Sequence, residues 1–213
     1  AGGRYRLTPP VASVRVPRTV QPVLAARIDG LRAPEKQLLQ EAAVIGHDVP
    51  FGLLHAISRL SEDECRVSLG DLERAGFLYA TQLFPDLQYT FKHSLTHDVT
   101  YSGLLHERRR EIHGRIVESM ETLYADRLGE QVERLAEHAA RGQLREKAVA
   151  YLRQAAAKAA DRQAYREAVA LFEQALAALA QLPETRANLE QAVDLRFELR
   201  NVLQPLGHRE RMA

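Results

Sequence analysis

The sequence has no Trp, a single Cys and no excess of charge of either sign. The lone cysteine, Cys65, excludes an internal disulfide and a zinc site built from several cysteines. Because 29 Lys and Arg stand against 28 Asp and Glu, no global basic field would hold the chain on nucleic acid or on a membrane surface. No apolar run is long enough to cross a bilayer, and the first residues have neither an initiator Met nor the apolar core of a signal peptide. We therefore expect a cytoplasmic chain with no membrane partner, cut from a longer protein at both ends.

Phosphate-loop and nucleophile motifs are also missing. The sequence contains no G-x-x-x-x-G-K-[ST], no G-x-G-x-x-G and no G-x-S-x-G. Nucleotide chemistry needs a backbone cradle for the phosphates with a lysine, and this sequence contains no motif that supplies one. We therefore expect no enzymatic activity and no catalytic residue in this chain itself.

Glycine and proline divide the chain into two unlike parts. Seven of the nine prolines lie in the first 85 residues, whereas no Gly or Pro occurs between Gly142 and Pro183. After an extended lead-in at 1–19, helical spacing of apolar residues predicts helices over 20–31, 33–45, 50–58 and 61–76. Strand-like segments follow at 77–81 and 87–91, joined by a turn at Pro85. Short helices followed by a hairpin are typical of a winged helix, which we place within 20–105.

The second part is predicted to form a stack of long Ala-rich helices. A helix continues from 93 to 105, a connecting helix occupies 106–129, and four helical segments of similar length follow at 130–141, 144–160, 163–182 and 186–203. Tyr165, Ala168, Phe172 and Ala175 have the spacing of the second half of a tetratricopeptide repeat (TPR). The predicted fold is thus mainly α: a winged-helix domain with a short β-hairpin, then an antiparallel TPR-like stack over 130–213, truncated at its C-terminus.

We expect two hydrophobic cores. The first contains Leu38, Leu39, Ala42, Leu53, Leu54, Leu69, Leu72, Phe77, Tyr79 and Phe91. The second runs along the stack and contains Leu135, Leu152, Tyr165, Ala168, Leu171, Phe172 and Leu176.

Two histidines, His93 and His97, stand at i and i+4 on one predicted helix, a spacing that can hold a metal. Asp98 is adjacent, but no third or fourth ligand is evident, and His106, His113 and His138 would join only through folding. We therefore interpret the pair as surface or interface histidines, expect no metal, and expect zinc to leave the melting temperature unchanged.

Other reactive or charged residues have ordinary interpretations. Acidic neighbours raise the pKa of Cys65, which favours a buried helix cysteine over a nucleophile. The cluster of Arg108, Arg109, Arg110 and Arg115 either binds phosphate or nucleic acid, or pairs with nearby glutamates on a solvated helix face, which we favour. The helix before the hairpin, 61–75, carries five acidic residues against two basic ones, which disfavours DNA binding.

Three segments together resemble a known arrangement. They are Val16-Pro17-Arg18 through Gly30-Leu31, Leu38-Leu39-Gln40 through Ile45-Gly46, and Tyr89-Thr90-Phe91-Lys92-His93 through Tyr101, with Leu104-Leu105 and Arg109-Arg110-Glu111-Ile112-His113 following. Their combination resembles bacterial AAA/STAND-type signalling ATPases that join a class III adenylate/guanylate cyclase domain to TPR repeats, and LuxR-type large regulators share the same middle region. The resemblance covers essentially the whole chain and implies that 20–105 holds the end of the ATPase lid and the winged helix.

The resemblance also implies a site and a function. In related ATPases a histidine just after the wing contacts the ADP phosphate and holds the closed, inactive state, and its position matches His93. The Met-His-Asp motif of some relatives is absent here, since Lys92 precedes and Ser94 follows. His93 is therefore either a nucleotide contact or a structural residue at a helix N-terminus.

The implied role is a non-catalytic regulatory and protein-interaction fragment that couples nucleotide state to partner or signal binding in signal transduction. Its expected partners are the upstream ATPase and cyclase domains and a protein or peptide on the repeats. ATP or ADP with Mg is expected in the parent protein, and no cofactor in this chain. Two alternatives stay open: a piece of an ATP-dependent adenylate cyclase whose catalytic domains lie upstream, and a DNA-binding winged-helix transcription regulator.

Overall fold

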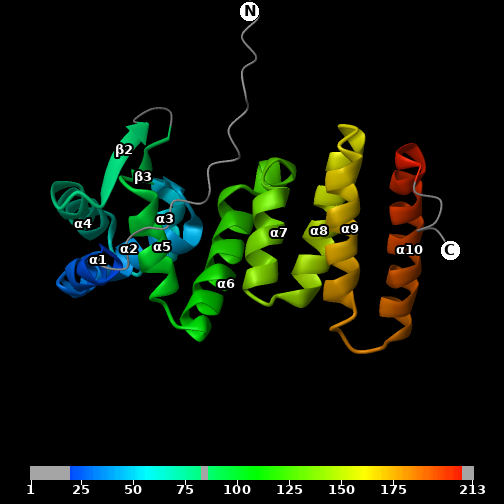
Figure 1. Cartoon of the computed structure of the whole chain (residues 1–213), viewed down its shortest axis with the longest axis horizontal. Helices are drawn as coiled ribbons and strands as arrows, with labels where there is room; N and C mark the ends of the chain where they lie inside the picture. Colours follow the sequence, from blue (N-terminus) through cyan, green and yellow to red (C-terminus); the bar gives the residue numbers. More distant parts are fainter. Residues whose placement is uncertain (1–19, 83–85, 208–213) are drawn as a thin grey trace, which may run out of the picture.

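The computed structural model describes residues 20–82 and 86–207 (Figure 1). These residues form a mainly helical protein with one small antiparallel sheet, which confirms the expected α-rich class. The lead-in expected at 1–19, the Pro85 turn and residues 208–213 lie outside the described ranges.

Short helices in the N-terminal half start where local sequence signals place them. They are α1 (Val20–Asp29), α2 (Ala33–Ile45), α3 (Phe51–Ile57), α4 (Glu62–Arg74) and α5 (Ser94–Ser102). The first turn of α2 contains Pro34, whose missing N–H does no harm there. At α4 the Glu64 N–H donates to Ser61 Oγ at 3.4 Å and the Ser61 N–H donates to Glu64 Oε2 at 2.9 Å. These reciprocal bonds form the capping box expected from the sequence.

The sheet has three strands in the order β1-β3-β2, all antiparallel. The predicted hairpin is confirmed as β2 (Leu78–Gln82) and β3 (Gln88–Phe91), whereas β1 (Asp48–Pro50) has no counterpart among the expectations. Strand β1 is three residues long with only Val49 fully buried, too short to show a period in the sequence. It ends at Pro50, which has no N–H, and the Phe51 N–H bonds to Leu87 O at 2.8 Å instead.

The prediction that Tyr79 belongs to the first core is wrong, because this residue is 45% exposed. Successive residues of a strand face opposite sides. In β2 the inward face is occupied by Leu78, so its neighbour Tyr79 points to solvent. The other nine residues of that set are buried.

Helix α6 (His106–Leu123) leads from this unit into a row of helices, with a 3₁₀ segment η1 (Ala125–Glu130) after it. The row consists of α7 (Val132–Arg141), α8 (Arg145–Asp161), α9 (Tyr165–Leu179) and α10 (Arg186–Leu203), followed by the 3₁₀ turn η2 (Gln204–Leu206). Each helix packs on the one before it, and α10 lies at the end far from the sheet (Figure 1). The four segments expected from the sequence are thus confirmed as helices, although the first begins at Val132 because the preceding turn is 3₁₀.

Two successive turns of this row have the same geometry. Gln143 and Gln163 both have positive φ, at 57° and 61°. The Leu144 N–H bonds to Ala139 O at 2.9 Å, and twenty residues later the Ala164 N–H bonds to Ala159 O at 2.9 Å. Both helices therefore end in a Schellman motif, and the repetition gives α8 and α9 equivalent starting points.

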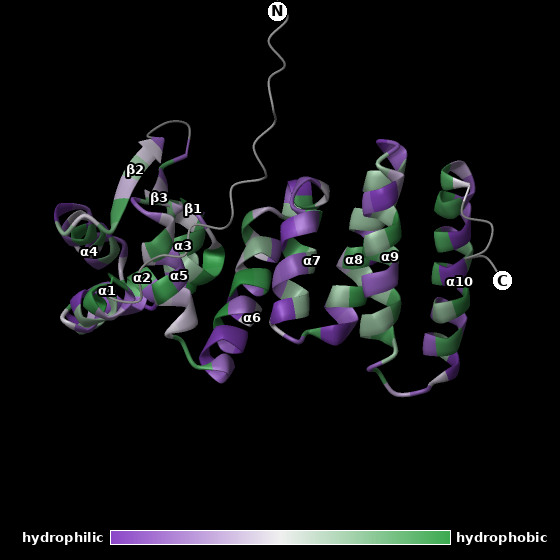
Figure 2. Cartoon of the chain, in the orientation of Figure 1, coloured by the Kyte–Doolittle hydropathy of each residue, from purple (hydrophilic) through white to green (hydrophobic). Residues whose placement is uncertain are grey.

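The two expected cores form one continuous cluster. Along the row, Leu135, Leu152, Ala168 and Phe172 are buried, and the half-buried Tyr165, Leu171 and Leu176 pack against them. The two parts merge because α6 contributes fully buried side chains between them, namely Ile112, Ile116, Val117 and Met120. Polar and apolar residues alternate around the helices of the row (Figure 2). On α10 an apolar stripe stays exposed, formed by Leu189, Val193 and Phe197.

A buried ion pair ties α6 to the N-terminal helices. The Glu41 side chain is fully buried, and Arg115 NH2 donates to its Oε1 at 2.8 Å. Arg115 NH1 also donates to Ile57 O at 2.6 Å. The arginine cluster pairs with carboxylates in part as expected, since Arg108 bonds to Glu111 at 2.6 Å, but the partner of Arg115 comes from α2, 74 residues away.

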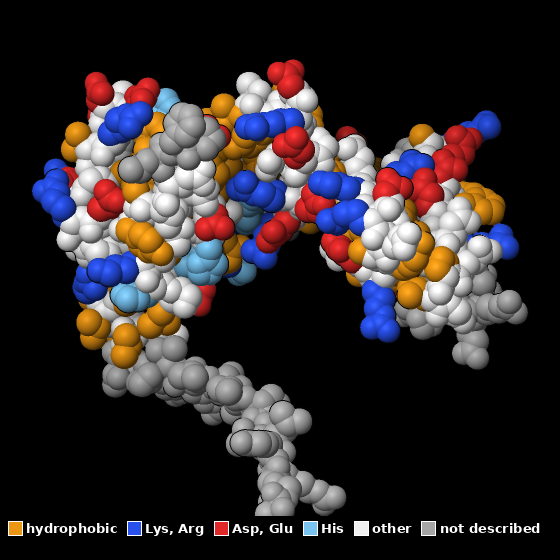
Figure 3. All heavy atoms as spheres, turned by 90° about the horizontal axis from the view of Figure 1, so that it is seen from above, with side chains coloured by type: hydrophobic (Ala, Val, Ile, Leu, Met, Phe, Trp, Pro, Cys, Tyr) orange, Lys and Arg blue, Asp and Glu red, His pale blue; other side chains and the backbone are white. Residues whose placement is uncertain are grey.

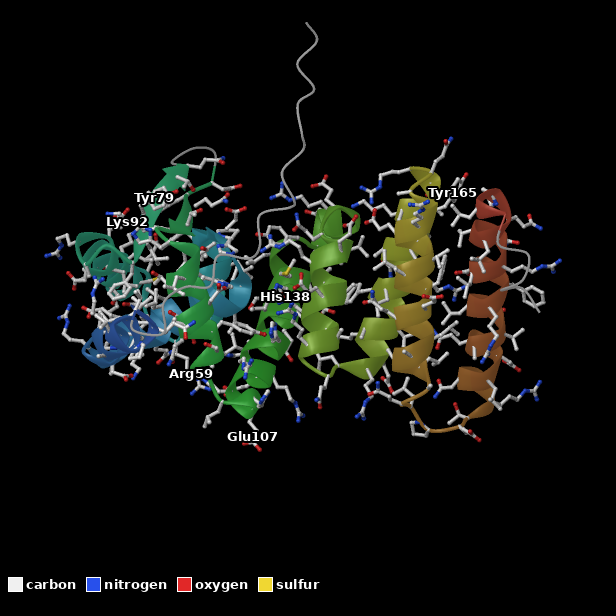
Figure 4. The ribbon with its side chains drawn as sticks, viewed as in Figure 1. Arg59, Tyr79, Lys92, Glu107, His138 and Tyr165 are labelled. Atoms are coloured by element: carbon white, nitrogen blue, oxygen red, sulfur yellow. The ribbon has the colours of Figure 1, made fainter. Side chains whose placement is uncertain are left out.

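Where α6 meets α7, two buried histidines share a hydrogen bond. His113 Nδ1 and His138 Nδ1 are 2.9 Å apart, and His138 lies between the two helices (Figure 4). Tyr101 Oη is 3.3 Å from His113 Nε2, and Arg109, Arg134 and Arg141 lie nearby. Burial, reinforced by Arg141 and Arg109, lowers the pKa of His113 to about 4. Burial, reinforced by His113, Arg134 and Arg141, lowers the pKa of His138 to about 3.

We expect Phe172→Ala to lower the free energy of unfolding by about 3–5 kcal/mol, because it leaves a cavity between neighbouring helices. Phe197→Ala is the matched control, since Phe197 is 57% exposed against 2% for Phe172, and its loss should stay below about 1 kcal/mol. Urea denaturation measures the free energy of unfolding of both variants. Equal losses would contradict the burial of Phe172 between neighbouring helices.

We also expect the stability to fall on acidification because of the His113–His138 pair. Both histidines have lower pKa values in the folded chain than the unfolded value near 6.5, so their stabilisation is complete above pH 6.5 and is lost as pH falls toward about 4 and 3. Each costs about 1.4 kcal/mol per pH unit in that window. Denaturant titrations at a series of pH values should show a shallower decline in a His113→Phe/His138→Leu variant. The control His106→Gln, at an exposed histidine, should keep the wild-type dependence of stability on pH. If the double variant also keeps it, the acid sensitivity does not come from His113 and His138.

Candidate functional site

The cleft that contains His93 lies between α1, the end of α4 and the start of α5. It encloses about 540 Å³. Its lining residues are Val20, Val23, Leu24, Arg27, Arg74, Ala75, Gly76, Lys92, His93, Leu95 and Thr96. The segments meet here because β3 returns the chain beside the α4–β2 turn, where the Lys92 N–H bonds to Phe77 O at 3.0 Å.

His93 is the residue that precedes α5. Its backbone is extended, with φ −140° and ψ 134°, and its carbonyl accepts the Thr96 N–H at 2.9 Å. The imidazole is exposed beside the first turn of a nine-residue helix, whose leading N–H groups have no partner inside the helix. The position combines a titratable ring with the positive end of a helix dipole.

Three cationic side chains share the cleft with His93, and among the described residues no carboxylate lines it. Arg27 is held in place, since its NH2 donates to Ala75 O at 2.9 Å and its guanidinium lies 4.9 Å from the centre of the Phe77 ring. Arg74 pairs with Asp71 on its own helix. Lys92 projects at the side of the sheet away from the helical row (Figure 4), and its ammonium has no ion-pair partner among the described residues. The charge of the lining is therefore positive.

Apolar side chains complete the cleft. Val23 is 62% exposed and Val20 is 44% exposed, both from α1, while Leu24 is buried beneath them. The lining offers cations and a helix N-terminus together with an apolar wall, which suits a small molecule that has both an anionic and an apolar part.

His97, four residues after His93 in the sequence, does not line the cleft. It packs against His47, with ring centres 4.3 Å apart, and against Phe91 at 5.2 Å. His93 is not part of this group, because it stands outside the helix, at the residue before α5. The i, i+4 spacing therefore does not bring the two histidines together.

Cys65 is buried as expected. Burial raises the pKa of its thiol to about 11, with the nearby Glu41 adding to the shift. A neutral, enclosed thiol is a poor nucleophile.

The sequence singled out His93 but gave no sign that Arg27 and Arg74 lie beside it in the cleft. These residues lie 66 and 19 positions from His93 on separate helices, and no local spacing connects them. Their only signal in the sequence is their position near helix C-termini, where basic residues are common for reasons of helix stability.

The surface of the described residues shows basic and acidic side chains mixed together over the face seen in Figure 3. No helix among the described residues is long and apolar enough to span a membrane. In comparisons with protein-family models and with curated proteins, nothing matched this chain.

Proposed function

We propose that this chain is a non-catalytic regulatory module that binds the phosphates of a nucleotide, ADP in the first instance, in the cleft around His93. The same module would present its helical row to a protein or peptide partner. The observation that carries the proposal is the convergence of His93, Lys92, Arg27 and Arg74 at the N-terminus of α5.

The cleft supports an anionic ligand on two independent grounds. The unpaired N–H groups and the dipole of α5 attract a phosphate. The cations add a long-range attraction, which salt would weaken. Arg27 and Lys92 come from different segments, so a phosphate bound between them would link α1 to the β3–α5 junction.

A nucleotide fits the shape as well as the charge. A volume of about 540 Å³ is within the range of small-molecule sites, and the exposed valines of α1 offer an apolar surface. The phosphate loop and the magnesium-binding acid would belong to an upstream ATPase domain, as the resemblance implies. His93 would then act as the donor that holds the closed state while ADP is bound and releases it on exchange.

The fold is compatible with the rest of this proposal. Helices α2, α3 and α4 followed by the β2–β3 hairpin have the order expected of a winged helix. The repeated turns at Gln143 and Gln163 have the regularity expected of TPR-like repeats. A groove of about 220 Å³ between α7, α8 and α9 is lined by small alanines with Gln143, Gln174, Gln181 and Arg145, and would take an extended peptide.

DNA binding through α4 is the weaker candidate. This helix would be the reading element of a winged helix, yet its first turn contains Glu62, Asp63 and Glu64. Two of its basic side chains are engaged within the helix, Arg66 with Glu62 and Arg74 with Asp71. A phosphate backbone would be repelled by this surface.

We expect ADP and inorganic pyrophosphate to bind the chain, and His93→Ala and Lys92→Ala each to weaken ADP binding by about tenfold, or about 1.4 kcal/mol. Isothermal calorimetry at low salt measures the affinity. His106→Ala is the matched control, since it removes an exposed histidine at the start of a different helix, and its affinity should not change.

The same titration should be repeated on a longer protein that adds the upstream ATPase core. There His93→Ala should again weaken ADP binding, with folding checked by circular dichroism. If ADP affinity is the same in wild type and in both cleft variants, His93 is a structural residue and the proposal fails.

A further inference from the structure

Three side chains that are able to bind metal converge on the side of α5 that faces the start of β1. His97 and Asp98 belong to α5, and His47 lies in the turn between α2 and β1. One ligand atom from each residue lies within 4.8 Å of those of the other two. We propose that His47, His97 and Asp98 bind a divalent transition-metal ion, zinc by preference.

The donor set favours zinc over the hard cations. Two imidazoles and one carboxylate suit zinc, nickel and copper, whereas magnesium and calcium prefer oxygen ligands alone. Three protein ligands leave a fourth tetrahedral position for water or a partner's side chain. The proposed site therefore holds an exchangeable ion and could accept one further ligand from outside the chain.

The geometry is close to what zinc requires. Zinc–ligand bonds of about 2.0–2.2 Å place neighbouring ligand atoms roughly 3.4 Å apart in a tetrahedron. His97 Nδ1 and Asp98 Oδ1 are already 3.1 Å apart. The His47 ring is stacked on His97 at 25° between planes, so rotation about its side-chain bonds is the main movement that coordination needs.

The central ligand is held in place by its surroundings. The His97 side chain is 16% exposed, with its ring edge-on to Phe91 at 5.2 Å and parallel to Tyr101 at 6.1 Å. His47 and Asp98 are exposed and can adjust. Because His97 is already held in place, metal binding has to order only two side chains, which lowers its entropic cost. The two exposed ligands leave the site open to solvent.

The sequence alone led to the opposite expectation, that zinc would not bind, because beside His93, His97 and the adjacent Asp98 it showed no third or fourth ligand. The structure replaces His93 with His47, fifty residues before His97. None of the three ligands lines the cleft around His93, so the metal proposal does not depend on the nucleotide proposal.

The test is a titration of the 213-residue chain with Zn²⁺ and with Co²⁺ above neutral pH, where histidine is deprotonated. We expect one tight equivalent of Zn²⁺ with a dissociation constant below about 100 µM. The melting temperature should rise with Zn²⁺ and not with Mg²⁺. Co²⁺ should give the visible absorption of a nitrogen- and oxygen-ligated tetrahedral ion.

Matched variants separate this site from the other histidines. His47→Ala, Asp98→Asn and His97→Phe, which keeps an aromatic ring against Phe91, should each weaken Zn²⁺ binding by at least tenfold. His93→Ala and His106→Ala should leave it unchanged. The proposal is overturned if wild type binds no more tightly than about 100 µM, if His47→Ala binds as wild type does, or if His93→Ala causes the same loss.

Discussion

The buried pair between Glu41 and Arg115 is the contact on which the arrangement of the molecule depends. It joins α2 to α6, and through Ile57 O it also fixes α3. Removing one member of such a pair leaves an uncompensated buried charge, which costs about 3–5 kcal/mol. Because α6 also packs on α7, which leads into the rest of the row, this pair links the N-terminal helices to the helical row.

What the sequence could predict was local. The capping box of Ser61 and Glu64, the proline in the first turn of α2 and the apolar periods of α7–α10 act within a few residues, so the helices could be located from them. Strand β1 could not, since three residues show no period. The partner of Arg115 and the neighbours of His93 and His97 were hidden for another reason: each comes from an element far away in the chain. Convergence of distant side chains is a property of the fold and leaves no spacing in the sequence.

Helix α5 faces three parts of the molecule within nine residues. Its N-terminus faces the cleft with His93, while His97 and Asp98 turn toward His47. Tyr101, one turn further, reaches His113 on α6, and Arg141 NH1 on α7 donates to the same hydroxyl at 3.2 Å. A ligand that changes the position of α5 would therefore act on the contact between the sheet-containing unit and the helical row. Gly142 supports that contact, because a Cβ there would lie 3.2 Å from the Gly114 nitrogen.

Each helix of the row α7–α10 packs mainly on its neighbours in the chain, so its stability depends on those neighbours. Releasing α10 breaks its interface with α9 and η2, whereas releasing α8 breaks interfaces on both sides. Among the described helices, opening therefore costs less at α10, where an apolar stripe is already in water, than at α8. Backbone amides should exchange with solvent in a gradient along the chain. A partner that bridges two helices of the row would slow exchange in every helix between it and α6.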